Sequence, residues 1–163
     1  MRRVECLDGD IRAYFELAAR VADGALCRQA RCGTVIVKDG EVIGRGYNGP
    51  PLDLESNRTC GRAWDYANKL KYDKTCCIHA EWRAILDACK RAGAQVEGST
   101  LYFMRIDEAG SFTDAGRPYC TVCSRLAMES GIAEFALWNE DGADIYPVAE
   151  YDCLSYEYHS VTT

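Results

Sequence analysis

Apolar residues recur at helical spacing in three stretches of the chain. The first predicted helix covers residues 10–25, and its apolar face consists of Ile11, Phe15, Ala18, Ala19 and Ala22. The second covers residues 79–93, and its apolar face consists of Ala80, Ala84, Ile85 and Ala88. Gly93 ends this helix, and Gly131 ends the third, which covers residues 120–131. A short fourth helix is expected at residues 149–156 in an otherwise ambiguous tail.

The segments between these helices predict four strands. Residues 34–37 are apolar and β-branched, Asp39-Gly40 forms a two-residue turn, and residues 41–46 return as the second arm of a hairpin. Residues 99–105 and 133–139 are the other two strands. Because strands alternate with helices in the second half of the chain, we expect parallel pairing there. The fold class is therefore α/β, with a mixed sheet between helices, and residues 1–163 are expected to form a single domain.

Composition narrows the classes of protein that the chain could belong to. It is 48% apolar and 27% charged, as in ordinary globular proteins. No apolar run approaches the roughly 20 residues of a membrane span, and the charged N-terminus lacks the apolar centre of a signal peptide. We therefore expect a cytoplasmic protein without a membrane partner. The net charge of −6 argues against a nucleic-acid partner, which usually needs a basic face, and favours a small substrate.

Ten cysteines are many for a chain in a reducing compartment, where a disulfide framework is not expected. A single cysteine is most simply a small buried hydrophobic residue. Clustered cysteines, at Cys60, Cys76 and Cys77 and at Cys120 and Cys123, indicate metal binding instead.

Cys120 and Cys123 lie near the start of a predicted helix, and their spacing turns both thiolates toward one point. A redox pair, half of a structural zinc site or core packing would each explain this pair alone. His79 also lies at the start of a predicted helix. One histidine and two cysteines supply three protein ligands and leave a fourth tetrahedral position open, which is typical of catalytic zinc.

Glu81 lies two residues after His79, so it points away from the ligand position and can face the open coordination site. A carboxylate there can take a proton from zinc-bound water and deliver it to a substrate nitrogen. Alternatively, Glu81 is an ordinary glutamate in the first turn of a helix, where the helix dipole favours a negative charge.

The sequence His-Ala-Glu at residues 79–81, followed by Cys-x-x-Cys at residues 120–123, resembles the signature of zinc-dependent nucleobase deaminases. The chain is similar to the cytidine and deoxycytidylate deaminase superfamily, and it fits the deoxycytidylate (dCMP) deaminase branch best. The segments CGTVIVKDGEVIGRGYNGPP and CSRLAMESGIAEFALW resemble further parts of that branch, so that the similarity covers residues 18–138.

This resemblance implies a three-layer α/β/α fold with a mixed five-stranded sheet. It also implies that His79, Cys120 and Cys123 bind catalytic Zn²⁺, that Glu81 is the proton shuttle, and that Asn48 and Ala80 bind the substrate, Asn48 through the sugar. The implied reaction is hydrolytic deamination of a cytosine nucleotide, dCMP to dUMP, by attack of zinc-bound hydroxide on C4. The family is generally homo-oligomeric. In part of the branch a second, structural zinc is present, for which the candidate ligands are Cys27, Cys60, Cys76 and Cys77.

Two features depart from the branch: a polar insertion at residues 106–118, in a loop that lines the family's substrate cleft, and Arg83, where asparagine is usual. A nucleoside, a purine or pterin, or an antibiotic base therefore stays open as the substrate. Editing of tRNA or single-stranded nucleic acid, a zinc module without activity, and a thiol oxidoreductase also stay open as functions. Arg28, Arg31 and Arg45 are candidates for a phosphate site on position alone.

Overall fold

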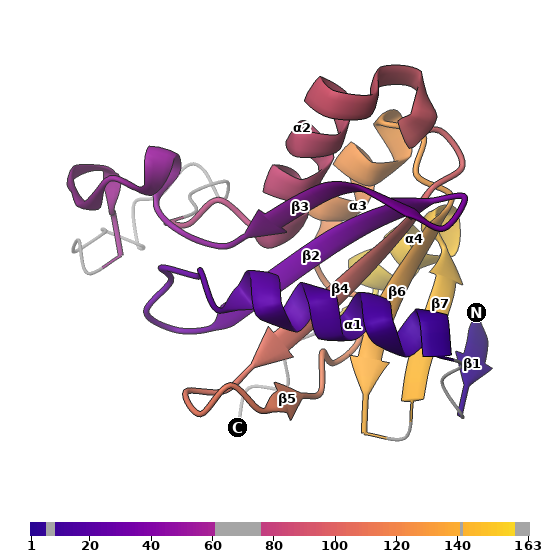
Figure 1. Ribbon diagram of the computed structural model, residues 1–163, viewed down its shortest axis with the longest axis horizontal. Coiled ribbons are helices and arrows are strands. Elements are labelled where there is room, and N and C mark those ends of the chain that lie inside the picture. Colours follow the sequence, from indigo (N-terminus) through magenta and orange to yellow (C-terminus); the bar gives the residue numbers. More distant parts are fainter. Residues whose placement is uncertain (6–8, 61–75, 141, 159–163) are drawn as a thin grey trace.

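The computed structural model describes residues 1–5, 9–60, 76–140 and 142–158 (Figure 1). Within these residues the strands are β1 (Arg2–Val4), β2 (Arg31–Lys38), β3 (Glu41–Tyr47), β4 (Thr100–Ile106), β5 (Phe112–Thr113), β6 (Glu134–Asn139) and β7 (Gly142–Pro147). The α-helices are α1 (Gly9–Ala22), α2 (Ala80–Ala92), α3 (Thr121–Glu129) and α4 (Val148–Tyr156). Short 3₁₀ turns are formed by Pro51–Asp53, Glu55–Asn57 and Gly93–Val96. No helix in the described ranges has the length and apolar character needed to cross a membrane.

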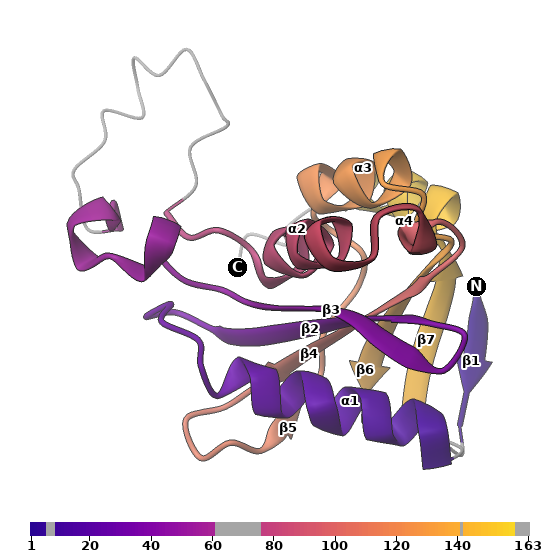
Figure 2. The same cartoon turned by 45° about the horizontal axis from the view of Figure 1, so that its top comes forward.

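One mixed sheet lies between two layers of helices. Its strand order is β1-β7-β6-β4-β2-β3, with β5 paired to β4. Strands β4 and β6 are parallel, and the other neighbouring pairs are antiparallel. Helix α1 covers one face, whereas α2, α3 and α4 cover the other (Figure 1, Figure 2). The predicted α/β class and the parallel pairing in the second half of the chain are confirmed.

The sheet has seven strands in the described residues, where five were expected. Strands β1, β5 and β7 account for the difference from the sequence pattern. Residues of β7 pair antiparallel with β6, and β1 pairs in turn with β7 at the edge of the sheet. Strands β1 and β5 have only three and two residues, and β7 is defined by its partners rather than by a strong alternation of its own, which explains why the pattern did not predict them.

Alternation along β4 divides the apolar core between the two faces. Leu101 and Phe103 face the α2 side, and Tyr102 and Met104 face the α1 side. On the α1 side, Phe15, Ala18, Ala19 and Ala22 are buried, as the helical pattern predicted.

Two glycines of β3 let helix α2 pack close to the sheet. A Cβ atom on Gly46 would lie 2.3 Å from the carbonyl oxygen of Ala80, and one on Gly44 would lie 2.4 Å from that of Ala84. Only glycine permits this approach without moving the helix. Because α2 begins directly after His79, this contact also positions the start of the candidate site.

Candidate active site

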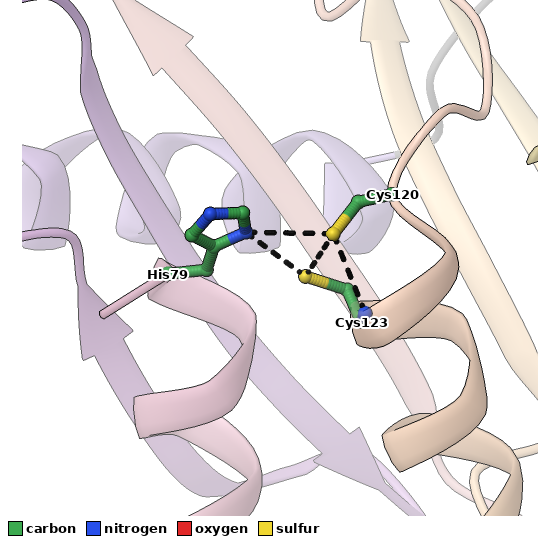
Figure 3. A group of neighbouring side chains, drawn as sticks. All are labelled: His79, Cys120 and Cys123. Atoms are coloured by element: carbon green, nitrogen blue, oxygen red, sulfur yellow. Dashed lines mark hydrogen bonds between the residues drawn. The ribbon is translucent and has the colours of Figure 1, made fainter. Parts of the chain in front are cut away.

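Three side chains from two helix starts converge at one point on the α2 side of the sheet. His79 is the N-cap of α2, and Cys120 is the N-cap of α3, with Cys123 in the first turn. The His79 Nδ1 atom lies 3.2 Å from Cys123 Sγ and 3.5 Å from Cys120 Sγ, and the two sulfur atoms are 2.9 Å apart. Figure 3 shows the imidazole and both thiols pointing toward one another. The predicted convergence of the two helix starts is confirmed.

The chemistry of this group fits a zinc ion. Its donor atoms lie within 4.8 Å of one another, and no other group of three His, Cys, Asp or Glu side chains in the described residues does so. A hydrogen bond from the Cys123 thiol lowers the pKa of Cys120 to about 4, against the opposing effect of burial, and a hydrogen bond from His79 adds to it. The contact with Cys120 also raises the pKa of His79. One nitrogen and two sulfurs leave a fourth tetrahedral position open for a reacting molecule.

Glu81 is buried beside this group, with 5% of its surface exposed. Burial raises the pKa of its carboxyl group, and the carboxyl group also interacts with the Cys123 thiol. A glutamate that served only the helix dipole would gain nothing from leaving solvent, since burial of a carboxylate is costly. A raised pKa instead suits a group that accepts and returns a proton near neutral pH.

A cavity of about 220 Å³ lies beside this group. His79, Ala80 and Glu81 are among the residues that line it. The other lining residues are Cys27, Arg28, Gln29, Ala30, Cys32, Asn48, Cys60, Cys76, Cys77, Phe103, Arg105 and Tyr119. Ala80 and Asn48, the two positions expected to bind substrate, therefore both border the cavity.

The side chain of Asn48 is already engaged by the backbone. Its Nδ2 donates to the Ala30 carbonyl at 2.8 Å, and its Oδ1 accepts from the Cys32 amide at 2.9 Å. These bonds fix the segment that leads into β2. One amide hydrogen of Asn48 remains for a ligand, so its contact with a sugar stays a prediction.

The four cysteines proposed for a second metal border the same cavity and contact one another in series. The Cys60 amide donates to Cys76 Sγ at 2.7 Å, and Cys77 interacts with both Cys76 and Cys27. Although burial opposes the change, hydrogen bonds from Cys60 and Thr59 lower the pKa of Cys76 to about 7. No three of these sulfurs form a ligand group of the kind that His79 belongs to. The second metal site stays a prediction.

The arginines that the sequence suggested for a phosphate differ in their surroundings. Arg28 borders the cavity but is paired with Glu55 at 2.7 Å. Arg31 is paired with Asp23 at 2.9 Å, and Arg45 borders a separate hollow between β3 and α2. None of these three therefore offers the cavity a guanidinium without a carboxylate partner.

Arg105 borders the cavity as well, although it was not among the arginines that the sequence suggested. A signal was present, because Arg105 is the one charge in the apolar strand TLYFMRI. Alternation from Leu101 and Phe103 places it on the same face of the sheet as the candidate site. The charge is therefore directed at the cavity rather than at the α1 core.

Arg83, the second departure from the branch, holds the segment that follows β3 and borders the separate hollow, not the cavity. Its guanidinium lies 2.7 Å from Asp53 Oδ1 and 2.7 Å from the Pro50 carbonyl oxygen, and it stacks 4.9 Å above the Tyr47 ring. The Tyr47 hydroxyl donates to Asp53 at 2.6 Å. This substitution thus has a structural role in the segment after Asn48.

Comparisons with a family model and with individual sequences identify the same family. The family model for the cytidine and deoxycytidylate deaminase zinc-binding region matches residues 9–138. A deoxycytidylate deaminase of Mycobacterium phage D29 is 33% identical over 125 residues, covering 73% of this chain and 86% of the phage protein. A deoxycytidylate deaminase of Saccharomyces cerevisiae is also 33% identical over 125 residues, covering 74% of this chain. The matched region spans 35% of the yeast protein.

Solved structures show the same fold. The dCMP deaminase of cyanophage S-TIM5 in its apo form is 21% identical, with a TM-score of 0.55, and the match covers 79% of this chain and 82% of that one. A cytidine deaminase from Burkholderia pseudomallei is 16% identical, with a TM-score of 0.55, and covers 86% and 94% of the two chains. Because the family model matches most of its length, the chain belongs to the cytidine and deoxycytidylate deaminase family.

Proposed function

We propose that this protein is a zinc-dependent deaminase that converts dCMP to dUMP and ammonia. The observation that carries the proposal is the group of His79, Cys120 and Cys123 with the buried carboxyl group of Glu81 beside it, where His79 and Glu81 line a cavity. The relatives named deoxycytidylate deaminase support the choice of a nucleotide over other deaminase substrates.

His79, Cys120 and Cys123 would hold the zinc ion. When bound, zinc lowers the pKa of a coordinated water to about 7 and so supplies hydroxide at neutral pH. In the reaction, an oxygen–carbon bond forms at C4 of cytosine, and the bond from C4 to the amino nitrogen breaks. Glu81 would take the two protons of the attacking water in turn and deliver one to N3 of the base and the other to the amino nitrogen, so that the amine leaves as ammonia.

The rest of the cavity would orient the base. Ala80 is 1% exposed and offers its backbone at the wall of the cavity beside Glu81. Asn48 would donate its remaining amide hydrogen to the sugar. Since both side chains are buried and Asn48 is held by two backbone hydrogen bonds, these contacts would be in place before the substrate enters.

We also propose that the protein forms a homo-oligomer. The outer surfaces of α2 and α3 expose three large apolar side chains, with 51% of Leu86, 55% of Val122 and 42% of Met128 accessible. Large apolar side chains that are exposed in one chain are what a subunit interface would cover. Light scattering after gel filtration tests this proposal, and a mass of one chain at micromolar concentration would contradict it.

The proposed cytoplasmic location has one further support: no disulfide joins the nine cysteines in the described residues. Fractionation of cells that express the protein tests this location.

A substrate panel tests the reaction. The zinc-loaded protein is incubated with dCMP, CMP, deoxycytidine, cytosine and guanine, and ammonia release is followed. We expect the highest kcat/KM with dCMP. If no cytosine compound is turned over, the proposed function is wrong, whereas turnover of guanine alone would move the protein to a different class of deaminase.

A further inference from the structure

We propose that Arg105 binds the phosphate of the nucleotide substrate and thereby makes the enzyme select a nucleotide over a nucleoside. This inference rests on the proposed deaminase function. It attributes the preference for a nucleotide to one residue outside the metal group.

The register of the sheet places Arg105 at the cavity. It lies near the carboxyl end of β4, directly opposite Cys32 of β2. Phe103, two residues earlier, lines the same cavity, as does Tyr119 from the segment before α3. Arg105 therefore lies in the wall of the cavity where β4 ends beside the start of β2.

Among the described residues, the guanidinium of Arg105 has no strong acceptor. Its Nε atom is buried and has no hydrogen-bond partner, and no ion pair of Arg105 occurs among the described residues. Its contact at the wall is the Cys32 thiol, which is a weak acceptor. Leaving a buried charged donor without an acceptor is costly, and an incoming ligand with anionic oxygens would remove that cost.

The charges around the cavity favour a phosphate as this ligand. The other lining arginine, Arg28, is already paired with Glu55, and the carboxyl group of Glu81 lies beside the metal group. Arg105 is thus a guanidinium without a carboxylate, inside a protein whose net charge is −6. The planar fork of a guanidinium matches two oxygens of a phosphate and holds them more strongly than it holds a neutral carbonyl.

The position of Asn48 agrees with this assignment. Asn48 accepts a hydrogen bond from the Cys32 amide, and Cys32 is the residue opposite Arg105. The residue proposed for the sugar and the residue proposed for the phosphate therefore flank the same point on β2. His79 and Glu81, which line the same cavity, would then take the base.

Kinetics with two substrates test the inference. Arg105→Leu and Arg105→Lys are compared with wild type on dCMP and on deoxycytidine. We expect Arg105→Leu to lower kcat/KM for dCMP by about 10- to 100-fold while leaving deoxycytidine within about twofold, because a hydrogen bond to a charged group is worth that factor. Arg105→Lys should lose less, since it keeps the charge but not the fork. Arg31→Leu is the matched control: it removes a neighbouring positive charge that does not border the cavity, and it should leave the preference unchanged.

Binding gives a readout that does not depend on turnover. Calorimetry is carried out on the zinc-loaded Glu81→Gln variant, with and without Arg105→Leu. Arg105→Leu should weaken the binding of dCMP by the same factor and leave the binding of deoxycytidine unchanged. Equal weakening of both ligands would show a contact with the base or a structural effect, and no weakening of either would place the phosphate elsewhere. Either result overturns the inference while leaving the proposed function intact. If the wild type neither binds nor deaminates any cytosine compound, the proposed function fails first and the inference with it.

Discussion

The metal group and the part of the cavity wall formed by the strands are built in different ways. His79, Cys120 and Cys123 are each within four residues of a helix start, so two short motifs define the metal group. Asn48 and Arg105 are brought together by the register of β2 with its two neighbours. The metal group is thus encoded locally, whereas the proposed recognition of the substrate depends on how strands far apart in the sequence are paired.

The largest expected effect is the loss of a metal ligand. Cys123→Ala should abolish stoichiometric zinc binding and lower dCMP deamination by at least about 1000-fold, because two protein ligands cannot hold a catalytic zinc ion. Metal analysis and ammonia release check this. Cys89→Ala, at an exposed cysteine on α2, is the matched control and should change neither quantity. Full zinc occupancy in Cys123→Ala would contradict the assignment of the metal group.

Glu81→Gln separates proton transfer from metal binding. It should keep its zinc and lose activity by about 100- to 10,000-fold, the usual contribution of a general acid–base group. The side chain stays nearly the same size, so the buried environment is kept. Steady-state kinetics on the zinc-loaded variant, with metal content measured on the same sample, provide the test. An active variant would show that Glu81 is not the shuttle.

Gly46→Ala tests the packing that positions the metal group. The new Cβ would lie 2.3 Å from the Ala80 carbonyl oxygen and 2.3 Å from the Ala84 amide, so α2 must move. We expect a loss of about 1–3 kcal/mol in the free energy of unfolding, as for other overpacked sites. Gly9→Ala, where the Cβ would meet nothing within 4 Å, is the control. Urea denaturation measures both, and equal stability of the two variants would mean that the close contact between β3 and α2 is not required.

The smallest effect concerns the ion pair between Arg83 and Asp53, which holds the segment after Asn48. A double-mutant cycle on Arg83→Ala and Asp53→Ala should give a coupling of about 0.3–1 kcal/mol, since 37% of the Asp53 side chain is exposed. Burial opposes the shift, but hydrogen bonds from Tyr47 and Arg83 lower the pKa of Asp53. The coupling is therefore present above the unfolded pKa of about 4 and is lost as the pH falls through the lower folded value. Denaturation curves at neutral pH and below pH 3 measure it; an unchanged coupling at low pH would contradict the ion pair.

The sequence predicted the parts of the molecule that local patterns control. Helix α2 and the β2–β3 hairpin follow from apolar periodicity and the Asp39-Gly40 turn, whose residues have φ values of 50° and 84° as such a turn requires. Strand β1 pairs with β7, and β7 pairs with β6, but no residue within β1 or β7 indicates this pairing in the sequence. Arg105 was missed for the same reason: its charge is visible in the sequence, but its place at the cavity follows from its register with Cys32.

The central claim is that zinc held by His79, Cys120 and Cys123 makes this chain a dCMP deaminase. The most direct measurement is a titration of metal-free protein with zinc while dUMP and ammonia are followed from dCMP. We expect no turnover without zinc, activity that rises with bound zinc and then reaches a plateau, and equal amounts of the two products. Turnover of dCMP at the same rate without metal, or none once zinc is bound, would contradict the claim.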